Sequence, residues 1–215
     1  PVAINFRHAM SQIVFNAKLT ANSSIDVEIK QIKVSGVKYK GTLTWAKETT
    51  APYLETTDND TETGDSWGIW TLNDEEYNGY QVYFDSQEQI TKLDEKNTEA
   101  GPIGHTLFLL PQRLDPWLTI KDGKVTATGK AKVTVTCKIT DRKSGLQLWP
   151  TKGKEQRDGY GNVAISLDNP KNDPNRDNTK EDDPKHDKWM QGKKYIYTLI
   201  FGEGGGYDPT DPDNP

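Results

Sequence analysis

The 215-residue chain contains a single cysteine, Cys137, and only three histidines, His8, His105 and His186. One cysteine cannot form an intramolecular disulfide, so a fold held together by disulfide bridges is excluded. The three histidines lie far apart in the sequence, without the short ligand spacings that are typical of metal sites. We therefore expect Cys137 to be a core side chain, and we expect neither a metal site nor a cofactor.

The chain also lacks long apolar runs and a large excess of one charge. The longest apolar run covers residues 107–110, far short of the roughly 20 residues that a membrane-spanning helix needs. Basic and acidic residues number 27 and 32, which leaves a net charge of −5 and no electrostatic reason to expect a nucleic-acid partner. We expect no transmembrane segment and no nucleic-acid binding.

Helical periodicity is weak throughout the chain. No stretch of about 12 residues has the i, i+3, i+4, i+7 apolar pattern with a cap, so we expect at most short helical turns, at residues 7–12 and 85–93. Alternation of apolar and polar residues, which is typical of β-strands, dominates instead. The clearest case is one strand face made of Ile13, Phe15, Ala17 and Leu19.

Two long alternating segments contain an irregularity. Ile29 and Ile32 have opposite parity within residues 25–34, so we predict a β-bulge near residues 30–31. Residues 125–139 alternate without interruption and would extend roughly 50 Å as one strand, which is unusually long. We expect Gly129 to bend or divide that segment.

The segment 194–201 is apolar on both faces. Tyr195, Tyr197, Leu199 and Phe201 alternate with a second row that includes Ile196 and Ile200, which predicts an inner strand or a strand that a partner covers. Many short alternating segments separated by Gly, Asn and Asp predict an all-β fold, an antiparallel β-sandwich.

Composition divides the chain into three parts. We expect a single β-sandwich domain over residues 1–203, with a polar insertion loop at about 168–188 that contains almost no apolar residue. Residues 204–215 form a Gly/Asp/Pro-rich tail. The chain begins at Pro1 within an alternating segment, which is typical of a mature product or an excised domain.

The sequence contains none of the common catalytic motifs. It has no Gly-x-Ser-x-Gly elbow and no phosphate-binding loop, and the acidic run 58–62 lacks the glycine and glutamate that an EF-hand requires at its sixth and twelfth positions. Nothing marks two of the carboxylates as a glycosidase pair. We therefore expect that the protein is not an enzyme and that it has no catalytic residues.

A cluster of aromatic residues leaves one alternative open. Surface glycan-binding modules stack sugar rings on exposed aromatic side chains, and Trp67 and Trp70 are the candidate stacking residues, with Trp117 and Trp149 elsewhere in the chain. Trp67 and Trp70 have opposite parity, so packing in the core and in a hairpin is the simpler explanation. It covers the set Trp67, Trp70, Tyr77, Tyr80 and Tyr83.

Four segments, in their order and spacing, resemble one family. Residues 2–15 (VAINFRHAMSQIVF), 32–42 (IKVSGVKYKGT), 109–112 (LLPQ) and 189–197 (WMQGKKYIY) are similar to conserved elements in the C-terminal half of fimbrillin-type (Mfa-like) surface proteins of anaerobic Gram-negative bacteria. The family's N-terminal domain, its lipid-bearing cysteine and a last apolar strand after Phe201 have no counterpart here. An excised domain would explain this, as would a mature product, and we leave both alternatives open.

The resemblance implies a transthyretin-like β-sandwich in a non-enzymatic fimbrial subunit, with a stalk, tip or anchor role left open. It implies export as a lipoprotein precursor and a location in an extracellular fimbria tethered to the outer membrane. The implied partners are other fimbrial subunits and a host or bacterial surface receptor. Such subunits polymerise by β-strand donation. The residues expected at that interface are Val2, Ile4, Phe6, Tyr195, Tyr197, Leu199 and Phe201.

Overall fold

The protein is all-β in a computed structural model. The described residues contain no helix, and the helical turns expected at 7–12 and 85–93 are wrong where they are described, because Ser11 and Gln12 begin one strand and residues 91–93 form another. The structure describes residues 8–45, 68–74, 76–77, 80–82, 90–115, 117–121, 124–127, 130–167 and 188–202.

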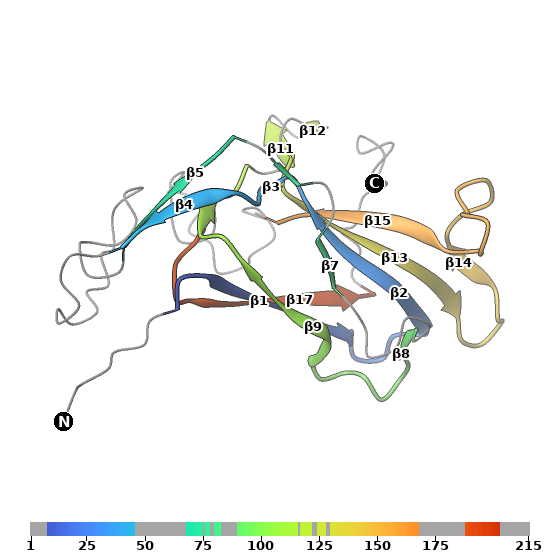
Figure 1. Cartoon of the computed structure of the whole chain (residues 1–215). Coiled ribbons are helices and arrows are strands. Elements are labelled where there is room, and N and C mark those ends of the chain that lie inside the picture. The colour runs from blue at the N-terminus through green and yellow to red at the C-terminus, as the bar shows by residue number, and fades with distance from the viewer. Residues whose placement is uncertain are drawn as a thin grey trace, which may run out of the picture.

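Two sheets pack face to face in a β-sandwich, as predicted (Figure 1). The first sheet has three strands in the order β17, β1, β9, with bounds Lys194–Phe201, Ser11–Leu19 and Gly101–Leu109. The second has six strands and is built on β2 (Ile25–Ser35) and β13 (Lys132–Asp141), which pair antiparallel. Around these two lie β7 (Tyr80–Val82), β8 (Thr91–Leu93), β14 (Gln147–Trp149) and β15 (Gly161–Ser166).

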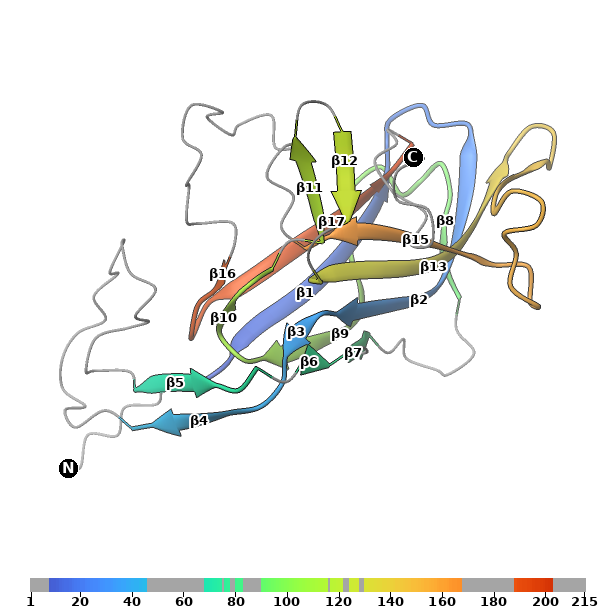
Figure 2. The ribbon, with the colours of Figure 1, turned by 90° about the horizontal axis from the view of Figure 1, so that it is seen from above.

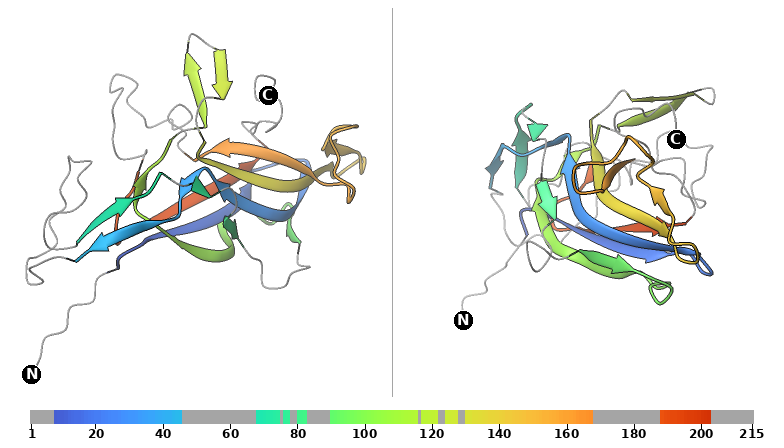
Figure 3. Two further views of the ribbon diagram at one scale, coloured as in Figure 1. Left: turned by 45° about the horizontal axis from the view of Figure 1, so that its top comes forward. Right: turned by 90° about the vertical axis from the view of Figure 1, so that its right-hand side faces the viewer.

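Short two-stranded pairs extend from this sandwich. Figure 2 shows β4 and β5 running away from one end of it, and Figure 3 shows β11 and β12 standing apart as a hairpin. The segment from Val37 to Thr44, which alternates apolar and polar residues in part, is divided into β3 and β4. The pairs are β3 (Val37–Lys38) with β6 (Glu76–Tyr77), β4 (Gly41–Thr44) with β5 (Ile69–Leu72), β10 (Gln112–Arg113) with β16 (Lys188–Trp189), and β11 (Leu118–Lys121) with β12 (Lys124–Ala127).

The core lies between the two sheets. The predicted face of β1 is buried, with Ile13 and Phe15 fully inaccessible to solvent. Each such side chain contributes about 1.5–3 kcal/mol through its burial. The core includes four residues of β1, four of β2 and three of β13, namely Ile13, Phe15, Ala17, Leu19, Val27, Ile29, Ile32, Val34, Val133, Val135 and Cys137.

Both predicted irregularities are present. Opposite β13, Thr136 pairs with Gln31 and Cys137 pairs with Ile29, so Lys30 is the extra residue of a bulge. The bulge turns both Ile29 and Ile32 into the core despite their opposite parity. The segment 125–139 is divided as well, because β12 ends at Ala127 and β13 begins at Lys132, while Gly129 itself lies outside the described residues.

The turn between β2 and β3 requires glycine at position 36. Gly36 has a φ of +71°, and a Cβ atom there would overlap the backbone carbonyl of Lys130. Gly145 offers a matched comparison, because its φ is +70° but a Cβ atom would meet no other atom within 4 Å.

We predict that Gly36→Ala destabilises the fold far more than Gly145→Ala. Gly145→Ala should cost only the strain of a left-handed backbone, about 1–2 kcal/mol in the free energy of unfolding. Gly36→Ala adds a steric overlap with rigid backbone and should cost about 3 kcal/mol or more. Urea unfolding of both variants measures the difference, and equal losses would show that the β2–β3 turn can move away from Lys130.

Candidate functional site: the free edge of β17

Strand β17 lies at the end of the three-stranded sheet. It runs parallel to β1, from Gln12 opposite Lys194 to Leu19 opposite Phe201. The other edge of β1 pairs with β9, so β17 has a strand on one side only within the part of the chain that is described. The sequence predicts an inner strand or a strand that a partner covers, and within the described residues β17 is an edge strand and not an inner one, so covering by a partner stays a prediction.

Four of the seven residues predicted for an assembly interface lie on β17, and their side chains point into the chain's own core. Leu199 is 7% exposed, and the ring of Tyr197 stacks on that of Phe15 with centroids 5.6 Å apart. The Trp189 indole N–H donates to the Tyr197 hydroxyl at 2.8 Å, and the Met190 amide donates to the Tyr195 hydroxyl at 2.7 Å. Tyr195, Tyr197, Leu199 and Phe201 therefore fix β17 in place.

The outward face of β17 is exposed and carries two isoleucines together with Lys194 and Thr198. Ile196 is 55% exposed and Ile200 is 41% exposed, although both lie within a regular strand. Val14 of β1 lies opposite Ile196, and Phe108 of β9, which is 59% exposed, lies opposite Gln12. The sequence signal for this strip was the second apolar row of residues 194–201, whereas nothing local distinguished Phe108.

The main chain of β17 directs half of its polar groups away from β1. The Lys193 carbonyl accepts a hydrogen bond from the Gln12 amide at 2.9 Å, and the Phe201 carbonyl accepts one from the Thr20 amide at 3.0 Å. Because consecutive residues of a strand direct their N–H and C=O groups to opposite edges, the even-numbered residues face the free edge. Ile196, Thr198 and Ile200 thus present donors and acceptors to an additional strand.

The other predicted interface residues, Val2, Ile4 and Phe6, lie outside the described residues. The same holds for Trp67, one of the two candidate stacking residues. Trp70 lies half-buried on β5, and its indole N–H donates to the Ala9 carbonyl at 2.7 Å. Its polar edge is therefore engaged within the chain.

The remaining aromatic candidates lie apart from Trp70 in the sequence and differ in exposure. Tyr80 packs against the core, as the packing explanation expects, and outside that set Trp117 is buried and Trp149 is half-buried. Trp45, at the end of β4, is 77% exposed and was not among the candidates.

Chemical candidates are few in the described part of the chain. Cys137 is completely buried, and this burial raises the pKa of its thiol to about 12. His8 is exposed and His105 lies on β9, whereas His186 is outside the described residues. The described ranges contain no group of three His, Cys, Asp or Glu residues that could hold a metal ion, and no helix suited to crossing a membrane.

A β-sandwich whose described strands leave the edge of β17 free defines a class of proteins that can bind or assemble through a strand edge. The sequence model of the fimbrillin-like family matches residues 1–210, so the chain belongs to the fimbrillin-like family. No curated protein and no solved structure matches the chain. The family consists of structural proteins of cell-surface fimbriae, not of enzymes, so a fimbrial-subunit role and a cell-surface location follow from membership.

We predict that Cys137 is unreactive in the folded protein. A thiol with a pKa near 12 is almost entirely protonated at pH 8, and the thiolate is the reactive form. A disulfide reagent such as DTNB should therefore label the native chain only as fast as it unfolds. A Lys143→Cys variant, in the exposed β13–β14 turn, should label within seconds. Rapid labelling of the native wild-type chain would show that solvent reaches the core beside β13.

Proposed function

We propose that the protein is a fimbrial subunit that assembles by addition of an extended segment to the free edge of β17. The observation that supports this most directly is the outward-directed main chain of Ile196, Thr198 and Ile200 on a rigidly anchored strand. Family membership supports the fimbrial role, and the edge supplies a physical means of polymerisation.

The proposed donor is the segment that contains Val2, Ile4 and Phe6 of a second copy. Its alternating apolar residues suit a strand with one buried face. Main-chain hydrogen bonds would hold the donor beside β17, and its apolar row would add to the exposed strip formed by Ile196 and Ile200. An edge with this composition favours association over a solvated state.

Finer features of the proposal come from the resemblance to fimbrillins. They include the transthyretin-like form of the sandwich, whereas its extent over residues 1–203, with a polar insertion at about 168–188 and a tail at 204–215, is inferred from composition. They also include export as a lipoprotein precursor and tethering of the fimbria to the outer membrane. The proposed partners are other fimbrial subunits and a surface receptor.

We predict that Thr198→Pro abolishes assembly while the fold is kept. Proline at this position removes an N–H group that faces the free edge, and edge strands tolerate proline there because pairing with β1 does not use that group. Thr198→Val keeps the N–H group and should assemble like the wild-type chain. Light scattering after size-exclusion chromatography measures the mass of the assemblies, and thermal unfolding confirms that both variants fold.

A second variant tests the donor. Ile4→Asp should weaken assembly because it places a charge in the middle of the apolar row, and mixing it with Thr198→Pro should not restore polymers. If Thr198→Pro assembles as well as Thr198→Val does, the junction between subunits lies elsewhere than at β17. If Ile4→Asp assembles normally while Thr198→Pro does not, β17 accepts a different segment.

A further inference from the structure

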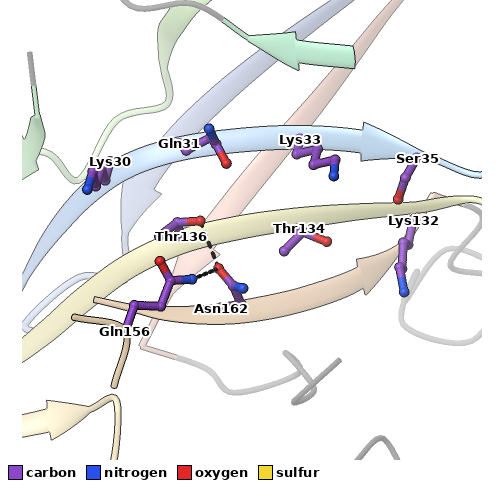
Figure 4. A pocket seen from close by; sticks show the side chains of 9 residues that line it. All are labelled: Lys30, Gln31, Lys33, Ser35, Lys132, Thr134, Thr136, Gln156 and Asn162. Atoms are coloured by element: carbon purple, nitrogen blue, oxygen red, sulfur yellow. Dashed lines mark hydrogen bonds between the residues drawn. The ribbon is translucent and has the colours of Figure 1, made fainter. Parts of the chain in front are cut away.

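The outer face of the second sheet carries a polar groove. This face is turned away from the core and from the three-stranded sheet that contains β17. The volume of the groove is about 590 Å³, within the range of sites that bind small molecules and short chains of sugars. Figure 4 shows its residues on three neighbouring strands and one loop, with Lys30 and Lys33 on β2, Lys132, Thr134 and Thr136 on β13, Asn162 on β15 and Gln156 in the β14–β15 loop.

The strand register brings these side chains to one face. Thr136 pairs with Gln31 on one side and with Asn162 on the other, and Thr134 pairs with Lys33. Directly paired residues of an antiparallel sheet point to the same face, so these pairs form successive polar rows across the sheet. Lys132, one pair further along, is a diagonal neighbour of Lys33, and such positions lie about 7–8 Å apart.

Two of the groove lysines lack a counter-charge in the described part of the chain. Two other lysines of this face have a negatively charged partner. Lys30 pairs with Asp158, and Lys138 lies 3.0 Å from a Glu28 carboxylate oxygen. By contrast, no described carboxylate pairs with Lys33 or Lys132. The ammonium of Lys132 lies instead 4.7 Å from the centre of the buried Trp117 ring, which holds it at the groove.

The two uncompensated charges interact with each other. The pKa of Lys132 is lowered, first because burial removes water from its ammonium and second because the charge of Lys33 repels it. In a chain with a net charge of −5, a pair of repelling lysines in a groove is a local reversal of sign. An anion placed between them would relieve this repulsion and offset the solvation that the Lys132 ammonium has lost.

The rest of the lining favours a ligand rich in hydroxyl groups. Thr136 and Gln156 both donate to the Asn162 side-chain oxygen, at 2.8 Å and 3.0 Å, which orients the amides toward the groove. The strands below already pair with each other, so a peptide could not extend the sheet here. From Lys30 to Ser35 the groove follows β2 for roughly 17 Å, far more than a single small ion would fill.

We propose that this groove binds an anionic oligosaccharide, a chain of sugars with sulfate or carboxylate groups. Lys33 and Lys132 hold its charged groups, and the threonine and amide side chains hydrogen-bond its hydroxyls. This site is distinct from the aromatic stacking expected at Trp67 and Trp70, and it does not depend on assembly at β17.

Isothermal titration of the full chain tests the site with four probes. These are a sulfated heparin hexasaccharide, an oligogalacturonate whose charges are all carboxylates, neutral maltohexaose and inorganic sulfate. We expect one or both charged oligosaccharides to bind, with an affinity that falls as salt is added. A comparison of the two shows whether the site prefers sulfate or carboxylate groups. Equal affinity for maltohexaose, or for sulfate alone, would overturn the proposal.

Matched charge-removing variants locate the binding. Lys33→Gln should lower the affinity for the charged oligosaccharide about tenfold, which is the loss expected for one charge-assisted contact. The thermal midpoint of unfolding should not fall. Lys143→Gln removes the same charge from an exposed turn outside the groove and should change the affinity less than about twofold. Equal losses in the two variants would show unspecific attraction, and no binding by either charged probe at millimolar concentration would exclude the site.

Discussion

The structure depends on the double pairing of β1. This strand holds β17 in parallel on one edge and β9 antiparallel on the other, and its inner face supplies Ile13, Phe15, Ala17 and Leu19 to the core. It thereby joins residues 11–19 to residues 194–201, which come from opposite ends of the described chain. β17 lies at the margin of that sheet, and its outer edge is free within the described residues because β1 is the one described strand that pairs with it.

The alternation of apolar and polar residues predicted which face of a strand is buried, but it did not predict which strands pair with each other. The buried row of β1 and the bulge at Lys30 both follow from the parity of apolar residues, since burial acts on each side chain locally. The parallel partner of β1 could not be predicted in this way, because no local pattern records which distant strand will pair. The same limit applies to Phe108, whose exposure results from the position of β9 at the sheet margin.

The groove was missed for a related reason. Lys33 and Lys132 are about a hundred residues apart, and each reads as an ordinary lysine on the solvated face of a strand. Only the register between β2 and β13 makes them diagonal neighbours, and only the position of Trp117 holds the second of them in place. Cross-strand placement created the charge pair, and it likewise packs the inner row of predicted residues on β17 against the chain's own core.

The two outer faces of the sandwich have opposite chemistry, and this difference separates their tasks. The outer face of the sheet that contains β17 exposes the apolar side chains Ile196, Ile200 and Phe108. The hydrophobic effect therefore favours contact of this face with a partner. The outer face of β2 and β13 is charged and rich in hydroxyl groups. Covering it with protein would bury lysines that have no counter-charge, which is unfavourable. A subunit joined to its neighbours through β17 would therefore leave its groove open. A row of such grooves along a polymer would hold a long anionic polysaccharide at many points, with an avidity far above the affinity of any one site.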